Sequence, residues 1–244
     1  MKADPKAQEQ LLQLQAYDLR EVQLAKQERE LPERATLEAL NADRATTRAD
    51  LASTSGVLED ARTELRRTES DVAVVEARIA KDAERMMGST SAKDASGFEH
   101  EIESLRRRQG DLEEIELAVM ERVEEHEAAV AALQARIEAL TAEIDGADAV
   151  LREALARIAG ERSSVEAARA ELVASLPEEL VALYERQRAR YGSGASLLRR
   201  GVSEASGVAL TGDELAKVKA AAPDDVLICP SSEAILVRTA ESGL

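Results

Sequence analysis

The chain has 244 residues, a formal net charge of −16 and only 2% aromatic residues. Globular cores of this size normally take much of their bulk from aromatic side chains, whereas 33% of this chain is charged. Such a composition is typical of long helices that meet along a narrow apolar seam. The acidic charge also disfavours broad contact with nucleic acid or an anionic membrane, because both are polyanions.

The excess of acidic residues lies mainly in the first part of the chain. Residues 1–176 carry 24 basic and 38 acidic side chains, and residues 177–244 carry 8 and 10. The single cysteine, Cys229, excludes an internal disulfide and fits a reducing compartment. The first ten residues lack the apolar segment of a signal peptide, and no run of about 18 apolar residues suits a membrane span. We therefore expect a cytoplasmic protein without membrane attachment.

The first predicted helix covers residues 7–30. Leucine and valine recur there at helical spacing, and the predicted apolar stripe is Leu12, Leu19 and Val22, with Leu14 and Leu24 beside it. Pro32 ends this helix, because a proline cannot donate to the preceding turn, and it suits the first turn of the next one.

Residues 33–86 and 98–175 each carry a seven-residue apolar repeat, which is the pattern of a coiled-coil seam. In the first segment the repeat positions are Leu37, Arg44, Leu51, Leu58, Leu65, Val72, Ile79 and Met86. In the second they are Ile102, Gln109, Glu116, Val123, Val130, Ile137, Ile144, Leu151, Ile158, Val165 and Leu172. His126 falls at a companion seam position, where we interpret it as a register-setting polar residue, since the only other histidine, His100, lies far along the helix.

Residues 87–97 (MGSTSAKDASG) are rich in turn-forming residues and predict the tip at which the two long helices fold back as an antiparallel hairpin. The second long helix is longer than the first. Helix 7–30 is expected to pack against the part of it that the first long helix does not reach. Because such a hairpin leaves little of its seam exposed, we expect a monomer or a weak dimer.

After Pro177 the pattern changes to that of a small mixed unit. We expect a short amphipathic helix over 177–190 and a flexible joint over 191–196. Thr211 and Glu214 form a capping box, and strands are expected at 226–228 and 235–237. The predicted fold class is therefore mostly α, with a hairpin domain over 1–176 and a small α+β domain over 177–244.

Several separated segments, in order, carry a resemblance to a known family. They are MKADPKAQEQLLQLQAYD, SAKDASGFEHEIESLRRRQGDLEE, LPEELVALYERQRAR and AAAPDDVLICPSSEAILVRTAESGL. The chain resembles a bacterial family in which a coiled-coil hairpin precedes a C4-type zinc ribbon. This resemblance implies a ribbon that contacts protein or nucleic acid, and relatives are linked to sigma-factor, secretion or flagellar-export partners.

The resemblance places the four zinc ligands at Ser203, Ser206, Cys229 and Ser232. Tetrahedral structural zinc requires four good donors, and a neutral serine hydroxyl is a poor ligand beside a thiolate. Because three of the four cysteines are serine here, we expect no bound zinc and no other cofactor. The C-terminal domain is thus predicted to be a degenerate zinc ribbon.

The sequence shows no catalytic constellation: there is no glycine-rich phosphate loop, no Ser/His/Asp set and no histidine pair at metal spacing. The leading hypothesis is a non-enzymatic scaffold or adaptor that docks protein partners through the hairpin and the C-terminal unit. The alternative is nucleic-acid binding through a basic patch in the C-terminal region. The candidate residues for that patch are Arg186, Arg188, Arg190, Arg199 and Arg200.

Overall fold

The computed structural model describes all residues, 1–244, and has the predicted mostly α fold with a small strand-containing part. The helices are α1 (Pro5–Arg29), α2 (Pro32–Gly88), α3 (Ala92–Ser175), α4 (Glu178–Tyr191) and α5 (Gly212–Ala220), followed by a 3₁₀ turn at Ala240–Ser242. The strands are β1 (Ala195–Arg199), β2 (Val202–Ser203), β3 (Val208–Ala209), β4 (Leu227–Ile228) and β5 (Ile235–Val237). No helix is long and apolar enough to cross a membrane.

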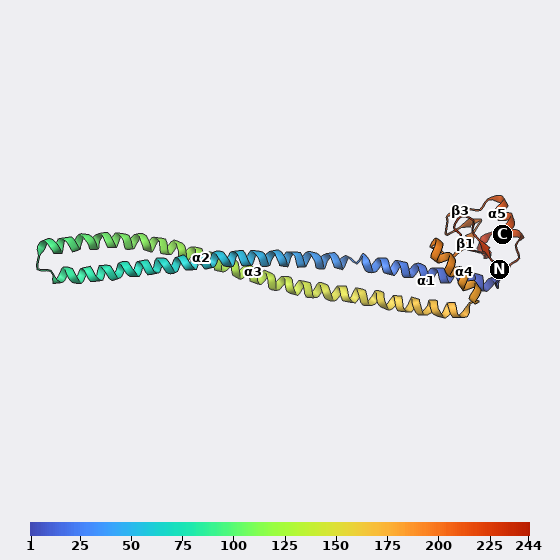
Figure 1. Ribbon diagram of the computed structural model, residues 1–244, viewed down its shortest axis with the longest axis horizontal. Helices are drawn as coiled ribbons and strands as arrows, with labels where there is room; N and C mark the ends of the chain where they lie inside the picture. Colours follow the sequence, from blue (N-terminus) through green and yellow to red (C-terminus); the bar gives the residue numbers. More distant parts are fainter. The chain divides into compact units, whose positions relative to one another are not determined.

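The chain forms two compact units. The hairpin unit is Glu33–Ala149, and the terminal unit combines Met1–Pro32 with Val150–Leu244. Figure 1 shows α2 and α3 side by side and antiparallel in the hairpin unit, and both chain termini in the terminal unit.

The predicted seven-residue repeat forms the seam of the hairpin unit. Its repeat and companion positions are buried or half-buried throughout, and Leu58, Ala61 and Val123 make a fully buried cluster. Ion pairs cross the seam between exposed flanking residues. They join Arg62 to Glu127 at 2.6 Å, Arg122 to Glu64 at 2.6 Å and Arg136 to Asp43 at 2.8 Å. The antiparallel coiled coil is therefore confirmed.

The link between α2 and α3 is shorter than the predicted turn over 87–97. Only Ser89–Ser91 lie outside the helices. Ser91 starts α3 early, because its hydroxyl accepts from the backbone N–H of Asp94 at 3.3 Å and its carbonyl accepts from that of Ala95 at 3.0 Å. This is the usual way in which a serine side chain caps a helix N-terminus.

In the terminal unit, α1 packs between the last turns of α3, helix α4 and the sheet. The main core cluster joins Leu11 and Leu14 of α1 to Leu180 and Tyr184 of α4 and to Ile235 and Val237 of β5. At the N-terminus, Ala3 N–H donates to Asp224 O at 2.8 Å. The predicted division at 176/177 thus differs from the observed grouping, because the residues after Pro177 share one core with α1.

The predicted apolar stripe of α1 is only partly buried: Leu14 and Leu24 are inside the core, but two of its members are not. Leu19 and Val22 are 52% and 64% exposed, whereas the buried face carries Gln15 and Asp18 beside the leucines. A hydropathy pattern predicts that polar residues are exposed. Gln15 and Asp18 are buried nonetheless, because hydrogen-bond partners offset the free-energy cost of burying their side chains.

The five strands form one sheet in the order β3-β2-β1-β5-β4. Strand β1 pairs parallel with β5, matching Ala195 with Ile235, and antiparallel with β2, matching Leu198 with Ser203. The capping box at Thr211–Glu214 is present at the start of α5. The predicted flexible joint at 191–196 is instead the ordered entry to β1, in which Ala195 and Ser196 are buried.

The first prediction concerns the shared core. Leu11→Ala should lower the stability of the terminal unit by about 2–5 kcal/mol, because it leaves a cavity beneath a fully buried position. All three tyrosines lie in this unit and the chain has no tryptophan, so tyrosine fluorescence during urea unfolding reports on this unit alone.

The matched control is Leu19→Ala on the same helix, which should change stability by less than about 0.5 kcal/mol because the side chain is half exposed. Equal losses for the two variants would show that α1 does not pack through its Leu11 face.

Candidate functional site

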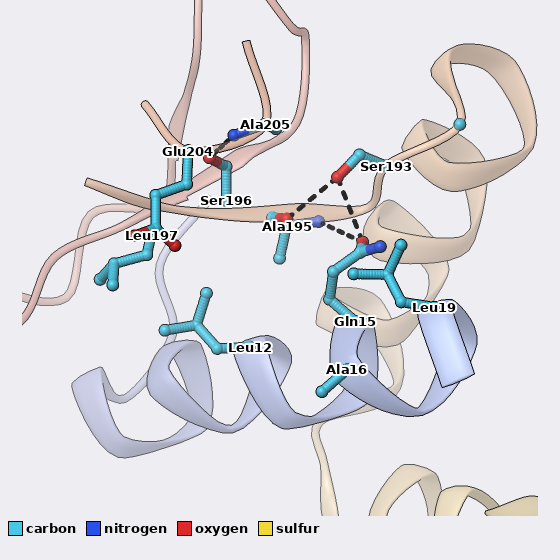
Figure 2. Close-up of a pocket in the computed structure, with 11 residues that line it drawn as sticks. Leu12, Gln15, Ala16, Leu19, Ser193, Ala195, Ser196, Leu197, Glu204 and Ala205 are labelled. Carbon is cyan, nitrogen blue, oxygen red and sulfur yellow. Dashed lines mark hydrogen bonds between the residues drawn. The ribbon is translucent and has the colours of Figure 1, made fainter. Parts of the chain in front are cut away.

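A pocket of about 500 Å³ lies between α1 and the start of β1 in the terminal unit. Figure 2 shows Leu12, Ala16 and Leu19 of α1 on one side and Ala195 and Leu197 of β1 on the other. The pocket lies along the half of β1 that β2 does not pair, since β2 joins β1 only from Leu198 onwards.

Gln15 anchors the wall of this pocket. Its Oε1 accepts hydrogen bonds from Ala195 N at 3.3 Å and Ser193 Oγ at 3.2 Å (Figure 2). It also accepts one from Gly194 N at 2.8 Å. These bonds satisfy backbone donors that would be costly to bury unpaired. They also hold the entry to β1 against α1.

Two glycines near this pocket are required, each for a different reason. Gly192 ends α4 in the left-handed region, with φ of +85°, which favours glycine. Gly194 packs directly on Tyr184, and a Cβ at this position would lie 2.4 Å from the Tyr184 ring. The segment therefore packs closely against α4, with no room for a larger side chain at position 194.

Behind the pocket, Asp18 is 3% exposed; its carboxylate accepts hydrogen bonds from Tyr184 and Arg169 and forms an ion pair with Arg188. Tyr184 OH lies 2.5 Å from its carboxylate, Arg169 Nε 2.7 Å and Arg188 Nε 3.0 Å. Arg169 also pairs with Glu185. This polar cluster joins α1, α3 and α4.

The cluster shifts two pKa values. Burial, followed by the hydrogen bond to Asp18, raises the pKa of Tyr184 far above its usual value. The hydrogen bond to Asp18 likewise raises the pKa of Arg169, against the opposing effect of burial. Tyr184 therefore remains a neutral hydrogen-bond donor, and Arg169 remains a cation.

The pocket offers few charged groups. Glu204 is the only ionisable side chain that lines it, and Arg199 Nη1 lies 2.9 Å from that carboxylate. The remaining lining is apolar side chains, serine hydroxyls and one amide.

The four positions at which the family resemblance places zinc ligands lie on two similar turns. Gly207 N donates to Ser203 O at 2.8 Å, and Glu233 N donates to Cys229 O at 2.9 Å. Both turns end in the left-handed region, with φ of 67° at Gly207 and 57° at Glu233. Hydrogen bonds from their own backbone thus close both turns.

Hydroxyl groups surround the one cysteine. Ser203 is buried, and its Oγ lies 2.9 Å from Ser196 Oγ. Burial raises the pKa of the Cys229 thiol, but hydrogen bonds from Ser203 and Ser232 outweigh that effect, and the net pKa is lowered. One thiol and three hydroxyls do not make a donor set suited to structural zinc. No group of three or more His, Cys, Asp or Glu side chains is arranged to hold a metal ion.

The five arginines of the predicted basic patch have different surroundings. Arg188 pairs with Asp18 and Glu185, and Arg199 pairs with Glu204 and Glu241. Arg190 lies 5.3 Å from the centre of the Tyr191 ring. Arg200 is exposed at a positive φ of 48°, and Arg186 lies on α4. Carboxylates therefore neutralise two of the five, which reduces the cationic surface available to a polyanion.

Sequence reasoning missed Gln15 and Asp18 as determinants of this site. Each sits among apolar helical residues, with no spacing rule that marks it as buried. Their partners come from residues 169–195, and only the folded chain brings these segments together.

Comparison with known proteins gives consistent results. Residues 14–192 match the model of the CT398-like coiled coil hairpin domain. The uncharacterized protein Rv2229c of Mycobacterium tuberculosis is 36% identical over 239 residues, which cover 98% of each chain. A solved structure from Mycobacterium smegmatis aligns with a TM-score of 0.85 and 35% identity, covering 98% of this chain and 100% of the other. CT398 from Chlamydia trachomatis shares the fold, with a TM-score of 0.64, 17% identity and coverage of 96% and 98%.

The second prediction is that the purified protein binds less than about a tenth of an equivalent of zinc, because Ser203, Ser206, Cys229 and Ser232 offer one thiol and three weak hydroxyl donors. Elemental analysis measures the metal, and near-stoichiometric zinc would overturn the expectation. The triple variant Ser203→Cys, Ser206→Cys and Ser232→Cys should bind about one equivalent, since the two turns are already closed.

The third prediction concerns Tyr184. Its raised pKa means that the folded state keeps the phenol proton at alkaline pH while the unfolded state loses it. The contribution of Tyr184 protonation to the free energy of unfolding is fully present below about pH 10. It is lost as the pH rises above that value, by at most about 1.4 kcal/mol per pH unit.

Absorbance titration of the folded protein should therefore show that one of the three tyrosines ionises only on unfolding. Tyr184→Phe should abolish this late ionisation, and the control Tyr191→Phe, at a 43% exposed position, should retain it. Simultaneous ionisation of all tyrosines in the folded wild-type protein would contradict the buried Tyr184–Asp18 contact.

Proposed function

Since the chain belongs to the family of CT398-like coiled coil hairpin domain proteins, we propose that it is a non-enzymatic scaffold or adaptor. In this proposal it docks protein partners through its terminal unit and its hairpin unit. The pocket between α1 and β1 is the docking site of the terminal unit.

One observation carries this proposal. The pocket places a half-exposed leucine, Leu19, over an apolar lining, and its one carboxylate is already paired with Arg199. Recognition pockets of this kind take an apolar side chain of a partner, while a few fixed polar groups orient it. Gln15 is such a group, because its bonds to β1 fix its position.

The rigidity of the pocket wall also supports a docking role. A preorganised surface loses little conformational entropy when a partner binds. The wall here is held by the Gln15 bonds, by the close contact of Gly194 with Tyr184, and by the two hydrogen bonds and one ion pair of Asp18.

Nucleic-acid binding through the C-terminal region remains the alternative. The ion pairs of Arg188 and Arg199 weigh against it, as does the net acidic charge of residues 177–244. The partner experiment below therefore includes a nuclease treatment that separates the two functions.

The fourth prediction tests the pocket. Leu19→Arg should reduce capture of specific protein partners from a cell extract at least about tenfold, because a charged side chain cannot enter an apolar contact without a desolvation cost. Quantitative mass spectrometry of proteins retained by the immobilised full-length chain measures the loss.

The control is Val22→Arg, which adds the same charge to the same helix at a 64% exposed position outside the pocket. It should leave capture unchanged. Equal retention by wild type and Leu19→Arg would exclude the pocket as a docking site, and release of the captured proteins by nuclease would favour the nucleic-acid alternative.

A further inference from the structure

The pocket between α1 and β1 lies along an incomplete edge of the sheet. Strand β1 is five residues long, whereas β2 is two residues long and pairs only with Leu198 and Arg199. The first half of β1 therefore has β5 on one side and no strand on the other. Figure 2 shows α1 facing this half of β1 across the pocket.

The backbone groups of Ala195 and Leu197 point toward the side without a strand. Ile235 N donates to Gly194 O at 3.0 Å, and Ala195 is in parallel register with Ile235, so the backbone groups at 194 and 196 face β5. Those of Ala195 and Leu197 face the opposite way, because the direction alternates along a strand. Glu204 N agrees with this, since it donates to Leu197 O at 3.0 Å from that side.

One of the four backbone groups on this side is left without a partner. Ala195 N donates to Gln15 Oε1 at 3.3 Å, and Ala195 O accepts from Ser193 Oγ at 3.1 Å. Leu197 O accepts from Glu204 N, but no oxygen accepts from Leu197 N, because the pairing with β2 starts one residue later. Leu197 is half-buried, and an unpaired backbone N–H in such a place is uncommon. This N–H is therefore a donor available to a ligand.

The buried side chain of Gln15 provides a second free donor at the same edge. Gln15 is 8% exposed, and its hydrogen bonds are all made by Oε1, which accepts from Ser193 Oγ, Gly194 N and Ala195 N. These donors fix the orientation of the amide, and its Nε2 has no acceptor in the protein. The Gln15 amide thus takes the place of one peptide group of a neighbouring strand at Ala195. It leaves the next place, at Leu197, open.

The rest of the lining suits an extended segment without charge. The carboxylate of Glu204 is already paired with Arg199. An extended chain beside β1 directs every second side chain toward α1, where Leu12, Leu19 and Leu197 line the pocket with apolar surface. A helical partner would not satisfy the free N–H, because its backbone carbonyls are bonded within the helix.

We infer that the pocket binds an extended, uncharged segment of a partner protein by strand addition to β1. A carbonyl of the segment accepts from Leu197 N, and an N–H of the segment donates to Ala195 O, whose second lone pair is free. An apolar side chain of the segment lies against Leu12 and Leu19. The inference rests on the proposed docking function of this pocket and assigns the partner's backbone as the group that is recognised.

The probe for the test comes from a phage-displayed library of random linear heptapeptides, selected on the immobilised full-length protein. A selected peptide, synthesised with fluorescein, should bind the wild-type protein in fluorescence anisotropy and should bind Leu19→Arg at least about tenfold more weakly. Its backbone nitrogens are then methylated one at a time. Methylation of at least one of them should weaken binding at least about tenfold, because a methylated nitrogen cannot donate to Ala195 O.

A proline at position 197 tests the free donor directly. Leu197→Pro removes the N–H, and the matched control Leu197→Val keeps it with a side chain of similar size. Because this N–H has no partner in the free protein, proline removes no hydrogen bond from the sheet. Leu197→Pro should bind the peptide at least about tenfold more weakly than Leu197→Val. Tyrosine fluorescence during urea unfolding verifies that the terminal unit of both variants is folded.

A measurement on the wild-type protein keeps the inference testable if the proline variant does not fold. Amide hydrogen exchange, read at single residues by mass spectrometry, follows the Leu197 N–H with and without the peptide. Binding should slow the exchange of this amide at least about tenfold, because the N–H gains an acceptor.

Three results would overturn the inference: no selected peptide, equal binding by folded Leu197→Pro and Leu197→Val, or unchanged exchange at Leu197. A peptide that is lost with Leu19→Arg but tolerates every methylation and Leu197→Pro would show docking through side chains alone. The proposed function would then stand without strand addition. Unchanged partner capture by Leu19→Arg is the separate result that removes the proposed function itself.

Discussion

The terminal unit depends on one buried carboxylate. Asp18 accepts hydrogen bonds from Tyr184 and Arg169 and forms an ion pair with Arg188. It thereby connects α1 with α3 and α4, and Tyr184 lies 166 positions away in the sequence. Removing one member of such a cluster leaves a buried charge without its partner, which is far more costly than losing an exposed ion pair. The position of α1, and therefore the wall of the pocket beside β1, follows from this contact.

Local sequence patterns predicted the helices well, because their causes are local. The seven-residue repeat, the capping box at Thr211 and the breaks before Pro32 and Pro177 each act within a few residues. The buried face of α1 was predicted wrongly, because Gln15 and Asp18 bond to groups that lie far away in the chain. Residues 191–196 are predicted to form a flexible joint, because glycine and serine are common in mobile linkers. In the structure the same small residues instead allow close packing.

The two turns at Ser203–Gly207 and Cys229–Glu233 are closed by their own backbone. Each keeps its backbone hydrogen bond and its left-handed last residue. Hydroxyl contacts near Ser203 and Cys229, together with β1 and β5, hold the turns within the sheet. The strands that carry these turns pack into two cores: Ala195, Ile235 and Val237 share one with α1, and Leu198, Val218, Cys229 and Leu236 form a second.

The link Ser89–Ser91 constrains how the hairpin can change in length. A connection this short holds the two helices in one fixed pairing, so that each seam residue on α2 has a set neighbour on α3. An insertion in one arm alone would shift every contact beyond it out of phase. Evolutionary lengthening or shortening is therefore expected only as matched changes of seven residues in both arms, which makes paired indels a signature to look for among homologous chains.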